Sequence, residues 1–249
     1  MADDAGRDAL MDRLDPRARV AAAFAFSVLV AVGPRPAAAL AALAAAGAAA
    51  AISGLRARDI VRRLAPVGAF LPLIWLTLPF TRPGQPVFRL GPLAATDPGL
   101  RLALLVTLKA LAVTLALVAL LGRMDLPRLG HALHHLRVPD KLVHLLLMAA
   151  RYVDVLRAES ARLASAMKAR AFRPRASPRT FRAAGYLAAM ILIRGFDRAA
   201  RVHAAMKLRG FRGRFYVLSH FAFARRDLAF CAAAGLILGL IAWMQWTAT

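Results

Sequence analysis

The chain has 249 residues, of which 60% are hydrophobic, and it carries 35 Lys and Arg residues against 13 Asp and Glu residues. A soluble domain has closer to about 45–50% apolar residues, so this composition indicates a membrane protein with a basic face. One cysteine excludes a disulfide framework and a Cys-based zinc site. The single glutamate, Glu159, leaves little material for paired-carboxylate chemistry, and no Gly-x-x-x-x-Gly-Lys-Ser/Thr phosphate loop occurs. We therefore expect a protein that is not an enzyme and that takes any energy it needs from a partner.

Five apolar runs follow in chain order, and each is a candidate membrane-spanning helix, because roughly 20 apolar residues cross the hydrocarbon core. The runs cover residues 19–32, 37–55, 64–80, 100–121 and 228–246. The second run is nearly pure alanine. Its small residues either let neighbouring helices approach closely or reflect a compositional bias without structural meaning. Whether this run crosses the whole membrane stays open.

The distribution of positive charge predicts the orientation. Residues 1–19, 56–63 and 122–226 together hold 30 of the 35 Lys and Arg residues. Positive residues gather on the cytoplasmic side, so the N-terminus is predicted to be inside and the C-terminus outside. The first 15 residues contain five aspartates, which argues against a cleaved signal peptide because such a segment begins with positive charge.

We predict an all-α fold, a polytopic membrane bundle of about five transmembrane helices with a cytoplasmic domain of long coupling helices. Residues 1–121 form a bundle of four spans, residues 122–226 form the cytoplasmic domain, and residues 227–249 form the last transmembrane helix. The positions of Gly and Pro divide the cytoplasmic domain into three helices, which run from about 125 to 137, from 139 until Pro174, and from about 178 to 208.

The ends of the two long helices match each other. Residues 166–175 and 205–214 are identical at seven of ten positions. The shared end residues are Lys168, Arg170 and Phe172 in the first copy and Lys207, Arg209 and Phe211 in the second. One interpretation is two well-capped helix ends, because cations there are favoured by the helix dipole. We favour two docking points on a dimeric partner, because an aromatic residue flanked by arginines is typical of an interface hot spot.

Other residues suggest packing or chemistry less specifically. The third helix carries an apolar stripe of Leu192, Phe196, Ala199, His203 and Met206, which predicts packing along another helix and a core position for His203. His131, His134 and His135 share a helix face, but no carboxylate or fixed third ligand accompanies them, so we expect no metal site. Lys109 within the fourth run is either a functional intramembrane charge or a side chain that snorkels to the interface.

Three groups of residues resemble one family of membrane proteins. They are Leu14-Asp15-Pro16-Arg17 before the first run, the stretch Leu136–Glu159 with its Val138-Pro139 break and Arg151-Tyr152 pair, and the paired tripeptides Ala169-Arg170-Ala171 and Leu208-Arg209-Gly210. Together they resemble the transmembrane T component of energy-coupling factor transporters, most of all its cobalt/nickel branch, the Q protein. The tripeptides are the specific part of this resemblance.

The resemblance implies a scaffold and coupling subunit of an ABC-type importer in the bacterial inner membrane. Two ATPases, which bind ATP and Mg, would dock at the two tripeptides, with Lys168, Phe172, Lys207 and Phe211 in support. Each tripeptide arginine would meet acidic side chains of one ATPase. A separate membrane subunit would capture the substrate, and this chain would hold no cofactor. Closure of the ATPase pair would move the two helix ends, and about 45 Å of helix would pass the motion on.

One residue departs from the pattern of the family. Ala171 stands where the family commonly has Gly, so we expect that helix to continue slightly further before Pro174.

Several alternative functions stay open beside this resemblance. A T component for vitamin uptake would look similar, because cobalt or nickel as cargo rests on the resemblance alone. A protein that binds anionic lipid or nucleic acid would explain the charge of +22 but not the matched helix ends, and we expect no nucleic-acid partner. A membrane enzyme would lack an obvious acid–base pair.

Overall fold

The computed structural model describes residues 14–83, 86–90, 93–173, 175–211 and 225–246. The chain divides into two compact units, which we call the bundle unit and the two-helix unit. The bundle unit consists of Met1–Leu136 together with His220–Thr249, and the two-helix unit consists of Arg137–Ser219.

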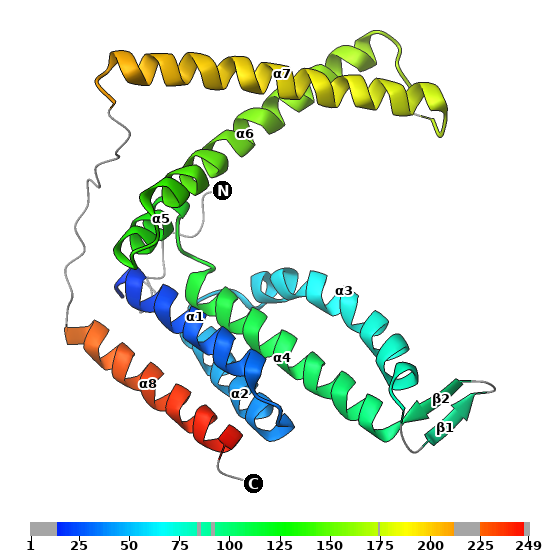
Figure 1. The fold of residues 1–249 in the computed structure, drawn as a ribbon, viewed down its shortest axis with the longest axis vertical. Coiled ribbons are helices and arrows are strands. Elements are labelled where there is room, and N and C mark those ends of the chain that lie inside the picture. Colours follow the sequence, from blue (N-terminus) through cyan, green and yellow to red (C-terminus); the bar gives the residue numbers. More distant parts are fainter. Residues whose placement is uncertain (1–13, 84–85, 91–92, 174, 212–224, 247–249) are drawn as a thin grey trace. The chain divides into compact units, whose positions relative to one another are not determined.

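The described elements are helical except for one hairpin, as the predicted fold class requires (Figure 1). The bundle unit contains α1 (Pro16–Val32), α2 (Pro36–Ile52), α3 (Ala57–Thr81), α4 (Asp97–Leu121), α5 (Leu126–His135) and α8 (Arg225–Trp246). The two-helix unit contains α6 (Asp140–Ala169) and α7 (Pro178–Leu208). The strands β1 (Pro86–Leu90) and β2 (Leu93–Thr96) pair antiparallel between α3 and α4, and this hairpin was not predicted from the sequence.

All five predicted apolar runs form helices, namely α1, α2, α3, α4 and α8. Among the described residues, α3, α4 and α8 are long and apolar enough to cross a membrane. The apolar helix α2 has 17 residues, which corresponds to about 25 Å of helix. The polar segment 122–226 is divided between the units, because α5 packs against α1 and belongs to the bundle unit.

The alanines of α2 form a packing surface. Ala38, Ala42 and Ala46, each four residues apart, are at most 2% exposed, and α2 packs along α4. On α4 the facing residues include Ala112 and Ala116, which are 0% and 3% exposed. Small side chains allow two helix backbones to approach closely, which is how helices associate in lipid. The structure therefore supports the packing interpretation of this alanine-rich run.

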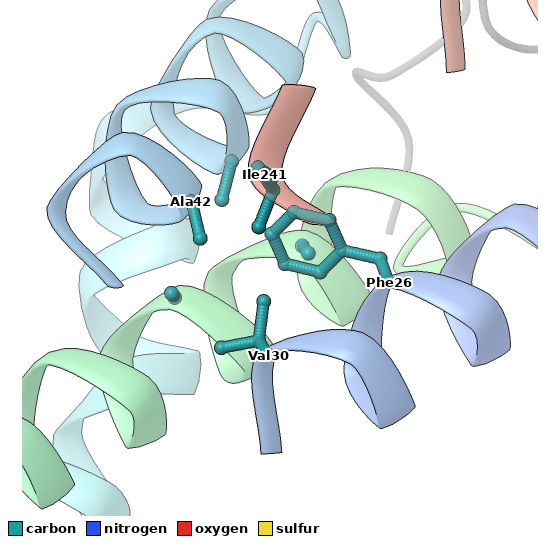
Figure 2. Packing of buried hydrophobic residues seen from close by; sticks show 7 residues of the cluster. Phe26, Val30, Ala42 and Ile241 are labelled. Carbon is teal, nitrogen blue, oxygen red and sulfur yellow. The ribbon is translucent and has the colours of Figure 1, made fainter. Parts of the chain in front are cut away.

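Larger side chains from α1 and α8 close the same core. Phe26 and Val30 of α1 and Ile241 of α8 pack with Ala42 of α2, as Figure 2 shows. Phe26 is 7% exposed, and Val30 and Ile241 are each 1% exposed. The C-terminal helix, far away in the chain, is thus an integral part of the bundle unit and packs against α1 and α2.

We predict that Ala42→Leu destabilises the bundle unit by about 1–3 kcal/mol, because the larger side chain does not fit between α2 and α4. Thermal unfolding of the purified protein in detergent measures the effect. Ala44→Leu is the matched control, because Ala44 is exposed on the same helix. Equal losses in the two variants would contradict the close packing of α2 on α4.

Candidate functional site

The first tripeptide forms a Schellman motif at the end of α6. Arg170 is the C-cap residue, and Ala171 has a left-handed backbone with a φ of 60°. The amide of Phe172 donates to the carbonyl oxygen of Met167 at 3.1 Å, and the amide of Ala171 donates to that of Lys168 at 3.0 Å. These two hydrogen bonds define the motif and satisfy carbonyls that a helix end leaves unpaired.

The second tripeptide builds the same motif at the end of α7. Arg209 is the C-cap residue, and Gly210 has a φ of 80°. The amide of Phe211 donates to the carbonyl oxygen of Met206 at 3.0 Å, and that of Gly210 donates to Lys207 at 3.0 Å. The motif commonly pairs apolar residues at the positions that Met206 and Phe211 occupy. The capping interpretation of the sequence repeat is therefore confirmed for the backbone.

The expectation that α6 continues past its tripeptide is wrong. Although Ala171 stands where the second copy of the repeat has Gly210, α6 ends at Ala169, as α7 ends at Leu208. The left-handed conformation costs a residue with a Cβ atom about 1–2 kcal/mol. Two satisfied carbonyls offset that cost, so both helices end at the same position of the repeat. Pro174, the predicted stop, lies outside the described residues.

The side chains of the tripeptides face solvent. Arg170 and Arg209 are exposed, as are Lys168 and Lys207. Leu208 is 90% exposed, an unusual position for a large apolar side chain. Phe172 and Phe211 are half-buried instead of exposed, which fits their place in the capping motif. Since the backbone caps itself, the two arginines are available to a partner, and the docking interpretation stays a prediction.

The two helices meet at a crossing (Figure 1). A Cβ atom on Gly195 of α7 would lie 3.8 Å from Cδ2 of Leu156 of α6. Glu159 of α6 forms an ion pair with Arg194 of α7 and a second one with Arg162 of its own helix. The tripeptides lie beyond the crossing, on different sides in Figure 1. Ten residues separate Glu159 from Ala169, which gives an arm of about 15 Å.

The contact that Glu159 makes between the two helices was not predicted from the sequence. Glu159 is 9% exposed, although it is charged. The hydrogen bond from Arg194 has the largest effect on its carboxyl, and the hydrogen bond from Arg162 has the next largest. Both hold the pKa of the carboxyl below the usual glutamate range. Two features of the sequence could have pointed to this residue: it is the only glutamate, and it stands three residues before an arginine on a predicted long helix. No sequence feature pointed to Arg194, 35 residues away.

The apolar stripe of α7 does not pack along another helix, and this expectation is corrected. Because α6 and α7 cross, Leu192 and Phe196 remain 62% and 68% exposed. The stripe instead lines one wall of a groove of about 690 Å³, whose other wall includes His144, Met148 and Tyr152 of α6. His203 is exposed on this groove and is not a core residue. Burial lowers the pKa of His144 on the facing wall.

The N-terminal motif ties three helices of the bundle unit together. The Asp15 carboxylate caps α1 by accepting a hydrogen bond from the Arg17 amide at 2.9 Å. The Asp15 amide donates to Oδ1 of Asp227 on α8 at 2.7 Å. Arg19 donates from Nε and Nη2 to the Leu120 carbonyl of α4, at 2.8 Å and 2.5 Å. The burial of Arg19 and Asp227, which are 3% and 2% exposed, was not predicted from the sequence.

Lys109 and the histidines of α5 make contacts within the protein. Nζ of Lys109 donates to the carbonyl oxygen of Ala31 at 2.7 Å, in the last turn of α1. Neither proposed role for Lys109 anticipated this capping contact. The rings of His134 and His135 lie edge to face with centroids 5.6 Å apart. Within the described ranges, no group of three His, Cys, Asp or Glu side chains is placed to hold a metal ion.

We predict that the Glu159 carboxyl titrates below the usual glutamate range. Because the folded-state pKa is depressed, the stability it contributes is present above the unfolded-state pKa and is lost as pH falls through the folded-state pKa. Since the chain has one glutamate, labelling with ¹³C-glutamate gives one carboxyl resonance to follow by NMR. Arg194→Gln should raise the midpoint. A wild-type midpoint in or above the usual range would contradict the ion-pair geometry.

We predict that Ala171→Gly raises the free energy of unfolding by about 0.5–1 kcal/mol, because relief of left-handed strain exceeds the entropic cost of glycine. Ala169→Gly, within the last helical turn, should lower it by a similar amount. Thermal unfolding of the purified protein compares the two. Destabilisation by both substitutions would show that Ala171 is not strained.

Comparison with known proteins identifies the family. The family model described as CbiQ, cobalt transport protein, matches residues 8–217. A comparison with curated proteins gives no match. The matched segment includes the N-terminal motif, the helix crossing and both tripeptides. Because the match covers most of the chain and the helices are those of a polytopic membrane protein, this chain belongs to the CbiQ family of cobalt transport proteins and is a membrane transporter component.

Proposed function

We propose that the chain is the transmembrane coupling subunit of an energy-coupling factor importer for cobalt or nickel in the bacterial inner membrane. Two ATPase subunits dock at the tripeptides, and a separate membrane subunit captures the metal ion. ATP and Mg belong to the ATPases, and this chain contributes no catalytic residue. The N-terminus is cytoplasmic, as the positive charges predict.

One observation carries this proposal: two helix ends present the same capped motif with an exposed arginine. The backbone hydrogen bonds of the two motifs agree within 0.1 Å, and Arg170 and Arg209 occupy the same C-cap position. Arginine forms two parallel hydrogen bonds with a carboxylate, which fixes direction as well as position. Two equal sites fit a partner with two equal grooves, such as a symmetric dimer of ATPases.

The mechanism follows from rigid helices joined at a crossing. When ATP closes the ATPase dimer, the two grooves change their separation and carry the tripeptides with them. Each helix moves as a rod, because its internal hydrogen bonds are intact over about 45 Å. The displacement of the ends becomes a rotation at the crossing. That rotation is the motion that the substrate-capture subunit would receive.

We predict that Arg170→Glu together with Arg209→Glu abolishes association with the ATPases while the protein remains in the membrane. A charged hydrogen bond contributes about 1.5–3 kcal/mol, so two losses weaken binding by more than about 100-fold. Co-purification in detergent with mass spectrometry measures the ATPase that accompanies each variant. Each single variant should retain part of the binding, because the other site still holds.

The matched control is Arg179→Glu together with Arg182→Glu. Both arginines are exposed on α7, and the pair changes the net charge by the same amount. This control should retain the ATPase and the uptake of cobalt or nickel by cells that express the complete transporter. If the control and the tripeptide variant lose the ATPase equally, general charge holds the partner and the tripeptides are only helix caps.

A further inference from the structure

The crossing of α6 and α7 has almost no hydrophobic support. No residue of α7 is buried, and the buried residues of α6 are Val143 and Glu159. Apolar area removed from water is the usual source of a fixed helix–helix angle. At this crossing Leu156 of α6 approaches Gly195 of α7, which has no side chain. Fully buried apolar side chains therefore contribute little to fixing the angle between the two helices.

The crossing also holds a charge arrangement centred on Glu159. Arg194, Arg198 and Arg201 of α7 line a cavity of about 300 Å³ at the crossing, together with Asp197 of the same helix. From α6 the cavity receives two apolar side chains and one charged residue, Glu159. Its carboxylate pairs with Arg194 across the crossing and with Arg162 along α6. Glu159 is therefore the one negative charge that α6 offers to three arginines of α7.

We infer that Glu159 is a positioning residue that clamps the crossing of α6 and α7 and thereby sets the separation of the two tripeptides. The clamp itself rests on the crossing geometry, and its consequence for transport rests on the proposed function. Without the carboxylate charge, α6 contributes no negative charge to the cavity that the three arginines of α7 line. The two helices would then rotate more freely about the contact between Leu156 and Gly195.

The length of the arms makes a small rotation important. Fourteen residues separate Arg194 from Leu208, so the α7 arm is about 21 Å long. A rotation of about 10° moves the end of such an arm by roughly 4 Å. A bidentate contact between an arginine and a carboxylate requires heavy atoms about 2.7–2.9 Å apart. A loose crossing would therefore misplace one tripeptide whenever the other is docked, or would absorb the motion that the ATPases deliver.

The clamp is tested on the full-length protein in detergent, without any partner. Nitroxide labels on Ser165→Cys and Ala205→Cys, exposed positions on α6 and α7, report the separation of the arms by pulsed electron paramagnetic resonance. Cys231→Ala removes the native cysteine. Glu159→Gln should broaden the distance distribution at least about twofold. Arg194→Gln, on the other helix, should broaden the distribution similarly. This variant tests the clamp if Glu159→Gln fails to fold.

Two variants separate the clamp from general effects of charge. Asp154→Asn removes an ion pair with Arg157 that has the same spacing on α6 but is exposed, and it should leave the distribution unchanged. Arg162→Gln removes the partner of Glu159 within α6 and should have a smaller effect than Arg194→Gln. An unchanged distribution in Glu159→Gln and Arg194→Gln, or equal broadening in Asp154→Asn, would overturn the inference.

The consequence for transport is measured on the complete transporter. Glu159→Gln should retain the ATPases but transport several-fold less cobalt per ATP hydrolysed, whereas Asp154→Asn should match the wild type. Unchanged coupling in a variant with a broadened distribution would overturn the functional role of the clamp. If no ATPase accompanies the wild type, the proposed function fails, while the distance measurements still decide whether Glu159 holds the crossing.

Discussion

Unpaired carbonyl groups at helix C-termini constrain this structure throughout. A helix leaves its last carbonyls without internal partners, and lipid offers no water to satisfy them. In the bundle unit, long cationic side chains from other segments of the chain donate to these groups. The contacts join Arg19 to Leu120, Lys109 to Ala31, Arg35 to Met244 and Arg63 to Gly122. These cations therefore hold the bundle together by satisfying its backbone.

In the two-helix unit the last helix carbonyls are satisfied by backbone amides instead of cationic side chains. At the ends of α6 and α7, the amides of the residues after the C-cap satisfy the carbonyls. No side chain is needed for this purpose, so Arg170 and Arg209 remain exposed. Arg19, Arg35 and Arg63 of the bundle unit donate to backbone carbonyls, whereas the tripeptide arginines are exposed to solvent. The basic composition alone does not distinguish these two uses.

Sequence analysis recovered what is encoded locally. The five apolar runs, the ends of α7 and the capped repeat follow from hydrophobicity, proline and glycine within a few residues. The polar contacts that fix the tertiary structure join residues far apart, such as Asp15 and Asp227 or Glu159 and Arg194. Their members are ordinary charged residues in the sequence. The stripe of α7 was read correctly as an apolar face, but periodicity does not say whether its partner lies in the same chain.

A crossing suits a two-point coupler better than a side-by-side pair. In an antiparallel hairpin the two C-termini would lie a full helix length apart, about 45 Å, and a change in that distance would require the packed helices to slide past each other. With arms of about 15 and 21 Å, the separation of the tripeptides instead depends directly on the crossing angle. A partner that moved both helix ends would then have to change the angle at the crossing of α6 and α7. Because no residue of α7 is buried, the stiffness of that crossing depends on the ion pairs of a single glutamate.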